Sequence, residues 1–213
     1  MRFHKDNQFY EFQARLAGYS IVAGIDEAGR GPLAGPVVAS AVILPEDITL
    51  PGVRDSKKMS ERAREEAFSL IESKAIGFSL AVVSSQEIDK VNILQATRKA
   101  MKVNILQATR KAMKEATLTL DPQPDYLLID GIYPVDLPIH QRCIVKGDDL
   151  SLSISAASVL AKVYRDRIMC QHHRLYSHYG FSSNKGYGTP GHINAITRFG
   201  PCHIHRLTFK GVL

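Results

Sequence analysis

Residues 20–44 read SIVAGIDEAGRGPLAGPVVASAVIL, and this stretch decides the fold. Residues 20–25 form a short apolar, β-branched run that predicts a strand ending at Asp26 and Glu27. A turn rich in glycine and proline follows at 29–35, and the apolar run after it predicts a second strand. Because the first strand delivers a pair of carboxylates to its carboxyl end, the pattern indicates an α/β sheet with a ligand site at that edge.

The remainder of the chain alternates short apolar runs with longer helical patterns. Ser60 is typical of a helix N-cap, and Thr189-Pro190 predicts the start of a last helix that Gly200 closes. Further strands are expected at residues 36–44, 76–83, 126–129 and 142–145, and helices at residues 60–73, 152–169 and 190–199. This order predicts an α/β fold with a helix-rich C-terminal third, and no linker divides the 213 residues into separate domains.

Carboxylates follow three of the predicted strands. The segments are GIDEAGRG at 24–31, LLIDG at 127–131 and IVKGDD at 144–149. Ligands of open α/β sheets bind at the carboxyl ends of the strands, so these acidic side chains are expected to meet at one edge. They are Asp26, Glu27, Asp130 and one of Asp148 and Asp149. Crowded carboxylates repel one another unless cations such as Mg²⁺ neutralise them. A single strand-end aspartate more often caps a turn, but three converging strand ends favour a two-metal phosphodiesterase site.

Positive charge is concentrated in the last quarter of the chain. Residues 160–213 contain eight lysines and arginines and one acid, although the net charge of the whole chain is only +6. Four tyrosines lie in the same segment, and basic residues interleaved with aromatic ones favour binding of a polyanion such as nucleic acid. A solvated basic surface over core aromatic residues explains this composition equally well.

Several classes of protein are disfavoured by the composition. No apolar run approaches the roughly 18 residues of a membrane span, and no signal-peptide core precedes the first strand. Three cysteines without a CxxC pair argue against a disulfide framework and favour a reducing cytoplasm. The histidines and cysteines between Cys170 and His205 are zinc ligands by type, but their spacing matches no zinc-finger pattern. We interpret them as additions to the basic surface.

A perfect tandem repeat lies within one predicted helix. Residues 91–102 read VNILQATRKAMK, and residues 103–114 repeat the same letters. The repeat is too short for a solenoid, so we interpret 103–114 as a duplicate within one helix of a shorter parent chain. Twelve residues advance a helix by about 1200°, which leaves the apolar faces of the two copies about 120° apart. Because neither copy contains glycine or proline, we favour a continuous, elongated helix over a loop, with association or segment exchange through its exposed apolar residues.

Distinctive blocks of sequence extend over nearly the whole chain. They are GIDEAGRGPLAGPVVASAVIL (24–44), DSKKMS (55–60), EID (87–89), NILQAT (92–97), LLIDG (127–131), VKGDD (145–149), SISAASVLAKVYRD (153–166), NKGYGTPGH (184–192) and HRLTF (205–209). In these blocks and in their order, the chain resembles type 2 ribonuclease H, the bacterial ribonuclease HII family. The combination of DEAGRGP with SAASxxAKxxRD is highly specific.

This resemblance implies a ribonuclease H-like fold, in which a mixed central β-sheet is flanked by helices. Residues 1–213 then form a single catalytic domain, with 160–213 as its basic C-terminal helical extension. The acidic quartet of the family falls on Asp26, Glu27, Asp130 and Asp148, and it holds Mg²⁺ or Mn²⁺. Asp148 takes the fourth place because it directly follows the Lys-Gly dipeptide. One metal of the family's two-metal mechanism activates the attacking water, the other stabilises the leaving 3′-oxygen, and the product carries a 5′-phosphate.

The resemblance also implies how the substrate is recognised. Gly29, Arg30 and Gly31 correspond to a turn whose backbone approaches the ribose 2′-hydroxyl, the group that distinguishes RNA from DNA. Tyr187 corresponds to a tyrosine that packs against the sugar next to the ribonucleotide. From the residues alone, a plain tight turn and a packed core tyrosine are the alternatives.

Two further substrate contacts are expected from the residues themselves. Lys146, close to Asp148, offers a cation to the scissile phosphate, and Ser155 offers a hydroxyl near the start of a helix. The alternatives are surface solvation for Lys146 and close helix packing for Ser155. Residues 55–58, DSKK, are either a phosphate-facing loop or a solvated turn.

The function that we expect is endonucleolytic hydrolysis of RNA in RNA–DNA hybrids, with nicking on the 5′ side of single ribonucleotides in duplex DNA. We expect a cytoplasmic enzyme whose parent chain is a monomer without membrane partners. Ribonuclease HIII or a related metal-dependent exonuclease is one alternative, although ribonuclease HIII usually carries an N-terminal domain for which residues 1–19 leave no room. A non-catalytic nucleic-acid-binding module is another, but acids at a phosphate-binding surface are costly unless metals offset them.

Overall fold

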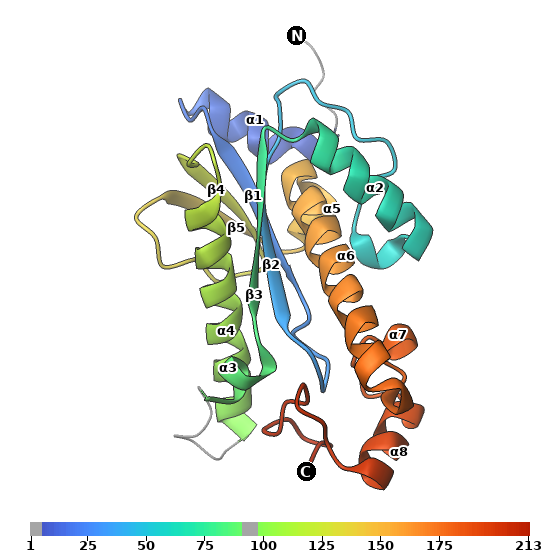
Figure 1. Ribbon diagram of the computed structural model, residues 1–213. Coiled ribbons are helices and arrows are strands. Elements are labelled where there is room, and N and C mark those ends of the chain that lie inside the picture. The colour runs from blue at the N-terminus through green and yellow to red at the C-terminus, as the bar shows by residue number, and fades with distance from the viewer. Residues whose placement is uncertain (1–5, 91–97) are drawn as a thin grey trace.

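The fold is built on a five-stranded sheet. The computed structural model describes residues 6–90 and 98–213 (Figure 1). The strands are β1 (Val22–Ala28), β2 (Val37–Ile43), β3 (Gly77–Val83), β4 (Tyr126–Asp130) and β5 (His140–Ile144), in the order β3-β2-β1-β4-β5. β2 is antiparallel to β1 and β3, whereas β4 is parallel to β1 and β5. The predicted mixed sheet is confirmed.

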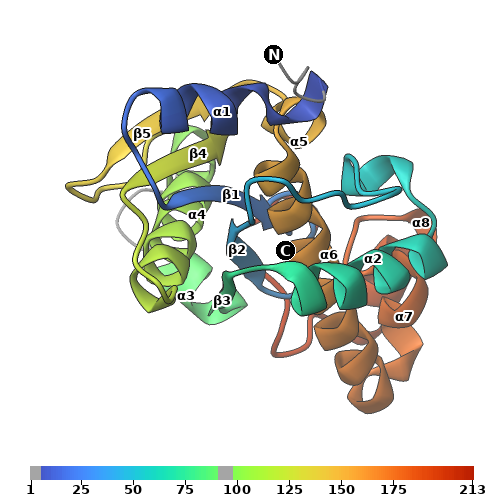
Figure 2. The same ribbon diagram turned by 90° about the horizontal axis from the view of Figure 1, so that it is seen from above.

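Helices cover both faces of this sheet (Figure 2). α4 (Arg98–Thr119) packs on one face, and α6 (Leu152–Leu175) with α2 (Glu61–Lys74) packs on the other. β2 is buried along its whole length because both of its faces are covered, and this explains its unbroken apolar sequence. Gly24 allows α6 to lie directly on β1, since a Cβ at this position would lie 2.2 Å from the backbone of Ser153.

The remaining helices are short. They are α1 (Phe9–Leu16), α3 (Ser85–Lys90), α5 (Gly147–Leu150), α7 (Phe181–Asn184) and α8 (Pro190–Phe199), with single 3-10 turns at Asp6–Gln8, Ser56–Lys58 and Ser177–Tyr179. Phe181, Ile196 and Ile204 belong to a separate apolar cluster that joins α7, α8 and the C-terminal segment to the end of α6. α6 crosses residue 160 without a break, so one continuous helix joins the basic C-terminal segment to the sheet. Within the described residues, no helix has the length and apolar character of a membrane span.

The capping residues of the sequence mark the starts of two helices. The Ser60 hydroxyl accepts a hydrogen bond from the Ala63 amide at the start of α2, and Thr189 caps α8 in the same way. The sequence does not predict α1 or α3, because helices of eight and six residues are too short for a periodic signal. β5 begins at His140 rather than at residue 142, and α6 continues to Leu175 rather than ending at residue 169.

α4 crosses the junction between the two repeat copies without a break. It contains residues 98–102 of the first copy and the whole of the second. Ile105, Ala108 and Ala112, all from the second copy, are buried against the sheet. The second copy therefore occupies the core position, and the helix is continuous over residues 98–119. Residues 91–97 lie outside the described residues, and association through the repeat stays a prediction.

Candidate metal centre

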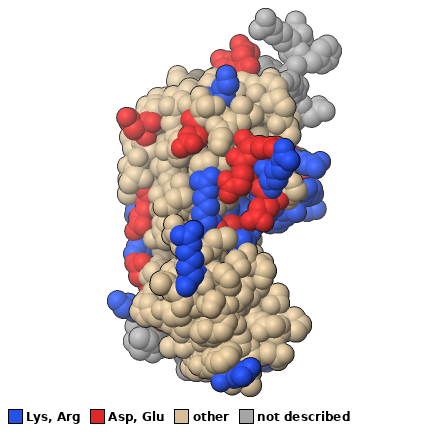
Figure 3. Space-filling view, turned by 45° about the vertical axis from the view of Figure 1, so that its right-hand side comes forward, with Lys and Arg blue, Asp and Glu red and all other residues tan. Residues whose placement is uncertain are grey.

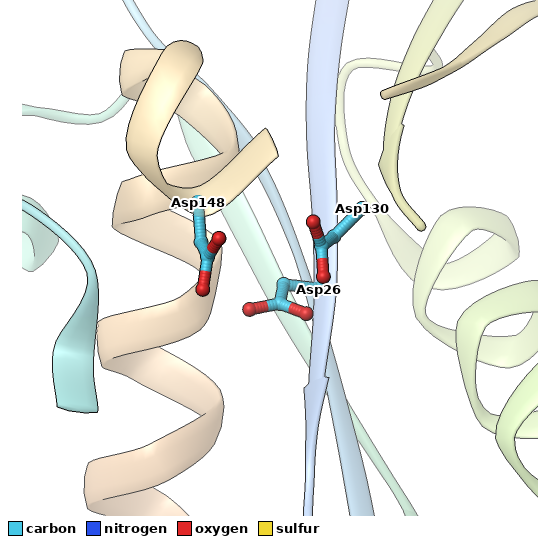
Figure 4. Close-up of side chains that lie close together, drawn as sticks. All are labelled: Asp26, Asp130 and Asp148. Carbon is cyan, nitrogen blue, oxygen red and sulfur yellow. The ribbon is translucent and has the colours of Figure 1, made fainter. Parts of the chain in front are cut away.

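Three carboxylates meet at the carboxyl ends of two neighbouring strands. Asp26 lies on β1, Asp130 is the last residue of β4, and Asp148 lies in the first turn of α5 (Figure 4). One oxygen atom from each side chain lies within 4.8 Å of the other two. β1 and β4 are parallel, so their carboxyl ends reach the same edge of the sheet, as the sequence argument requires. Among the residues that the structure describes, no other group of three histidine, cysteine or acidic side chains meets in this way.

Backbone hydrogen bonds fix two of these side chains. The Glu27 amide donates to Asp26 Oδ1 at 2.7 Å, and the Gly147 amide donates to Asp130 Oδ1 at 2.7 Å. Position 147 is tightly packed, because a Cβ there would lie 2.6 Å from a side-chain atom of α6. The cluster is therefore held in place by the protein itself.

The electrostatics of the cluster favour a bound cation. Burial, followed by the charges of Glu27 and Asp130, raises the pKa of Asp26 well above its ordinary value. Burial and the charge of Asp148 also raise the pKa of Asp130. A divalent cation would offset both the lost hydration and the repulsion, and three carboxylates are the hard oxygen donors that Mg²⁺ and Mn²⁺ prefer. The donor set therefore fits such a metal.

Glu27 lies beside the cluster, not within it. Its Oε1 accepts a hydrogen bond from Arg30 Nη1 at 3.1 Å. Successive residues of a strand point to opposite faces, so Glu27 points to the α4 side of the sheet and Asp26 to the α6 side. Burial raises the pKa of Glu27 against the opposing effect of Arg30, and the charge of Asp130 raises it further. Of the expected quartet, the structure brings three carboxylates together and leaves the fourth within electrostatic reach.

The two neighbouring aspartates of α5 have different surroundings. Asp148 is 5% exposed and accepts a hydrogen bond from Lys57 Nζ at 3.0 Å. Asp149 is exposed and pairs with Lys58 Nζ at 2.6 Å. The structure therefore places Asp148, and not Asp149, in the carboxylate cluster.

Lys57 is a site residue that the sequence leaves undecided. Burial by itself lowers the pKa of Lys57, but the hydrogen bond to Asp148 and the charges of Asp148, Asp26 and Asp55 raise it overall. The ammonium group therefore stays charged beside the carboxylates. The sequence signal is the DSKK segment, but the lysine and its partner are 91 residues apart and only the fold brings them together.

The Gly29–Gly31 turn directly follows β1 and lies against Tyr187. Gly29 has a φ of 98°, and a Cβ there would lie 2.2 Å from Arg165 Nε, so no other residue fits. A Cβ built on Gly31 would lie 3.8 Å from the Tyr187 ring. Tyr187 is 46% exposed. The structure thus brings together the two parts of the expected ribose site, a turn that is exposed at Arg30 and Gly31 and an exposed aromatic ring.

Lys146 and Ser155 have surroundings that differ from the expected substrate contacts. Lys146 is exposed and adopts a left-handed conformation with a φ of 59° in the turn before Asp148. Ser155 is 2% exposed, and its hydroxyl donates to the carbonyl oxygens of Asp148 at 2.7 Å and Ser151 at 2.9 Å. These two hydrogen bonds hold α5 against α6, and a contact between Ser155 and the substrate stays a prediction.

The second repeat copy forms one wall of the site. A cavity of about 270 Å³ opens beside Glu27 and Asp130, and its other lining residues include Leu106, Thr109, Arg110 and Met113 of α4. Arg110 Nε is buried there without a hydrogen-bond partner. The carboxylates lie outside the repeat, but the wall that adjoins them does not. The sequence does not show this neighbourhood, because it depends on how α4 docks on the sheet.

Comparison with known proteins finds similarity to ribonuclease HII over nearly the whole chain. The family model described as Ribonuclease HII matches residues 23–212. A ribonuclease HII from Geobacter sulfurreducens is 51% identical over 205 residues, which cover 95% of this chain and 89% of that protein. One from Geotalea uraniireducens is 52% identical over 203 residues, which cover 95% and 88% of the two chains.

Solved structures show the same architecture. Ribonuclease H2 from Pyrococcus horikoshii superimposes with a TM-score of 0.72 at 25% identity, covering 91% of this chain and 95% of that chain. A ribonuclease HII from Archaeoglobus fulgidus, solved in complex with PCNA, also gives a TM-score of 0.72, covering 90% and 96% of the two chains. A ribonuclease HIII solved with Mn²⁺ gives 0.68 at 18% identity, covering 100% of this chain and 74% of that chain, and shares the fold.

Proposed function

This chain belongs to the ribonuclease HII family of endoribonucleases, and from this premise we propose that it hydrolyses RNA in RNA–DNA hybrids and nicks duplex DNA on the 5′ side of single ribonucleotides. The proposed product carries a 5′-phosphate. The observation that carries the proposal is the position of the carboxylate cluster beside the Gly29–Gly31 turn and Tyr187. A phosphodiester held at the carboxylates then has its ribose next to the turn.

The carboxylate cluster is the proposed metal site. We assign Asp26, Asp130 and Asp148 as ligands and Glu27 as the fourth carboxylate. Two Mg²⁺ or Mn²⁺ ions at such a site supply an activated water and stabilise the leaving 3′-oxygen. The chain contributes carboxylates that are already fixed by backbone amides, which avoids the cost of ordering them during the reaction.

Three residues near the cluster receive roles from their contacts. Ser155 positions Asp148, because its hydroxyl bonds the backbone of that residue. Lys57 offers a cation beside the scissile phosphate, the role that the sequence suggests for Lys146. Lys146 remains our candidate for an outer contact to the phosphate backbone, because its side chain is exposed.

The backbone of the turn is the proposed sensor of the 2′-hydroxyl. The amides of Arg30 and Gly31 are on exposed residues and have no hydrogen-bond partner among the described residues. Gly31 carries no side chain that would keep a ribose away from these donors, and Tyr187 offers its ring to the adjacent sugar. Deoxyribose lacks the acceptor that these amides require, so selectivity for RNA follows.

The proposed cellular setting rests on the state of the cysteines. All three cysteines are free thiols in the structure, which supports a location in a reducing cytoplasm. The proposed partners are RNA–DNA hybrids and duplex DNA that contains ribonucleotides. We propose a monomeric parent chain, with association or segment exchange promoted by the repeat.

A duplex DNA with one ribonucleotide tests the proposed function. With Mg²⁺ or Mn²⁺, cleavage is expected on the 5′ side of the ribonucleotide, and the end groups of the product should include a 5′-phosphate. An all-DNA duplex should bind without being cut, because binding is mostly electrostatic whereas cutting needs the 2′-hydroxyl. Equal cutting of the all-DNA duplex would contradict the proposal.

Substitutions at α5 give the matched controls. Asp148→Asn is expected to lower the nicking rate at least about a hundredfold, as is Asp130→Asn, because each removes a metal-ligating charge. Asp149→Asn changes the same chemistry one residue away and should have a mild effect. If the two α5 variants lose activity equally, Asp148 has been assigned wrongly.

A further inference from the structure

Arg206 is a fully buried guanidinium without a carboxylate partner among the described residues. It is 0% exposed and makes five hydrogen bonds, all to backbone carbonyl oxygens. The acceptors are Gly29 at 2.6 Å, Arg30 at 3.0 Å, Pro32 at 2.9 Å, and Gly35 at 2.8 and 2.9 Å. An arginine side chain has five N–H groups, so this loop uses its entire donor capacity. Burying a charged group costs free energy of hydration. The five hydrogen bonds offset this cost, and they also fix the loop.

The bonds to Gly29 and Arg30 determine which way two peptide groups face. The carbonyl and N–H of a trans peptide point in opposite directions, because the group is planar. When the carbonyls of Gly29 and Arg30 point inward to Arg206, the amides of Arg30 and Gly31 must point outward. These are the two exposed donors that have no partner among the described residues. Arg206 thus turns a flexible glycine-rich segment into an outward-facing pair of N–H groups.

Arg206 is itself held from several sides. Its own amide donates to the Leu33 carbonyl at 2.8 Å, and its guanidinium lies 5.0 Å from the centre of the Phe209 ring. Asp89, at the end of α3, accepts hydrogen bonds from the Leu207 amide at 2.8 Å and the Thr208 hydroxyl at 2.7 Å. The guanidinium is therefore fixed before any substrate binds.

We propose that Arg206 is the positioning residue of ribonucleotide recognition: it acts through the Gly29–Gly31 turn and presents the Arg30 and Gly31 amides to the 2′-hydroxyl of the substrate. This inference rests on the proposed function of the same turn. Lysine cannot replace Arg206, because an ammonium has three donors without the planar fork that reaches four carbonyls at once. A donor pair fixed in advance also stabilises the transition state without reorganisation.

Arg206→Lys tests this role, with Ile71→Ala as a control for loss of stability. Ile71 is fully buried on α2, in an apolar cluster that includes neither Arg206 nor the turn, and its truncation also lowers the melting temperature. Below both melting temperatures, Arg206→Lys should lower kcat/KM on the single-ribonucleotide duplex at least about tenfold, whereas Ile71→Ala should retain it. The affinity of both variants for all-DNA duplex should stay within about twofold of the parent protein, because that binding is electrostatic.

Two further measurements separate positioning from folding. Amide hydrogen exchange of Arg30 and Gly31 should accelerate or redistribute in Arg206→Lys and not in Ile71→Ala. Methylguanidinium at millimolar concentration should restore part of the activity of Arg206→Ala. It should not restore activity that a variant such as Ile71→Ala loses through lower stability. If Arg206→Lys retains kcat/KM, or loses it only in proportion to melting temperature without rescue of Arg206→Ala, the proposal is overturned. If the parent protein does not discriminate the ribonucleotide at all, the proposed function fails instead.

Discussion

At the scale of single residues, Asp26 carries a conflict between folding and function. It is 3% exposed, and burial with two neighbouring carboxylates outweighs the hydrogen bonds from Ser158 and the Glu27 amide that favour its charged form. The raised pKa means that the metal-free protein keeps this carboxyl protonated to a higher pH than the unfolded chain does. A divalent metal needs the charged form, so metal binding must release protons and strengthen as pH rises.

The same conflict predicts how the stability of the metal-free protein depends on pH. Because the pKa of Asp26 is raised in the folded state, the folded protein binds more protons than the unfolded chain between the ordinary value of 3.8 and the raised value. The free energy of unfolding should therefore fall as pH rises through this window, and Mg²⁺ should restore it above the window. Asp26→Asn should remove much of this pH dependence and melt higher than the parent protein at neutral pH in EDTA.

Melting curves in EDTA across this pH range check the prediction. Asp149→Asn is the control, because that carboxylate is exposed and paired with Lys58 at the surface. A metal-free protein that gains stability as pH rises through the window would show that Asp26 is not held in its neutral form.

At the scale of elements, α4 shows why one repeat copy is used rather than the other. The second copy continues in the same helix to Ala116, and Leu120 directly follows the end of the helix; both residues are buried in the same core. The first copy could fill the core position only if the second were looped out in the middle of the helix, which would break backbone hydrogen bonds there. Extra residues cost less free energy at the start of a helix than in its middle, because no hydrogen-bonded turn has to be interrupted there.

Equivalent substitutions in the two copies are therefore expected to differ. Ala112 is 0% exposed, and Ala112→Asp buries a charge, which should lower the free energy of unfolding by about 3 kcal/mol or more. Ala100→Asp changes the same position of the first copy and should cost less than half as much. Chemical denaturation measures both, and equal effects would mean that the copies exchange places.

A chain with one copy provides the reference for this comparison. Deleting either copy yields the same sequence, and its single alanine at this position should respond as Ala112 does. The deletion should retain nicking activity, because the remaining copy supplies the same wall residues. It should also remove any concentration-dependent association that sizing detects in the full chain.

At the scale of the whole molecule, the charge of the C-terminal segment is less available than its composition indicates. Arg165 and Arg206 are buried on backbone carbonyls, Lys162 pairs with Asp166, and Arg167 pairs with Glu65. Figure 3 shows acidic and basic side chains interleaved in one band, with a mostly uncharged surface at the height of α7 and α8. This face therefore carries no continuous basic patch.

This charge distribution predicts that salt affects binding and selectivity differently. The logarithm of the affinity for all-DNA duplex should fall linearly with the logarithm of the salt concentration, because binding releases counterions from the DNA. The preference for the ribonucleotide over deoxyribonucleotide at the cleavage site should change little, because it depends on short hydrogen bonds at the turn. Affinity and nicking rates measured at several salt concentrations check this, and a preference that disappears with salt would assign selectivity to charge.

The strands, the long helices and the strand-end carboxylates of this protein could be predicted from its sequence alone. Apolar runs and capping residues are local signals, so the strands and the long helices could be predicted from them. Carboxylates at strand ends are also local, and parallel neighbouring strands bring such ends to one edge, so Asp26 and Asp130 could be expected together. The choice of Asp148 over Asp149 rested on resemblance, and the structure agrees in placing Asp148 in the cluster.

Which distant groups meet depends on the tertiary structure. Glu27 turns to Arg30 because strand residues alternate between faces, and Lys57 reaches Asp148 because the turn at 56–58 packs beside α5. Arg206 looked like part of a basic surface, yet it is buried against the Gly29–Gly31 turn from which it is separated by more than 170 residues. Such contacts depend on how helices dock on a sheet, and docking is set by the packing of the whole core rather than by any local pattern of residues.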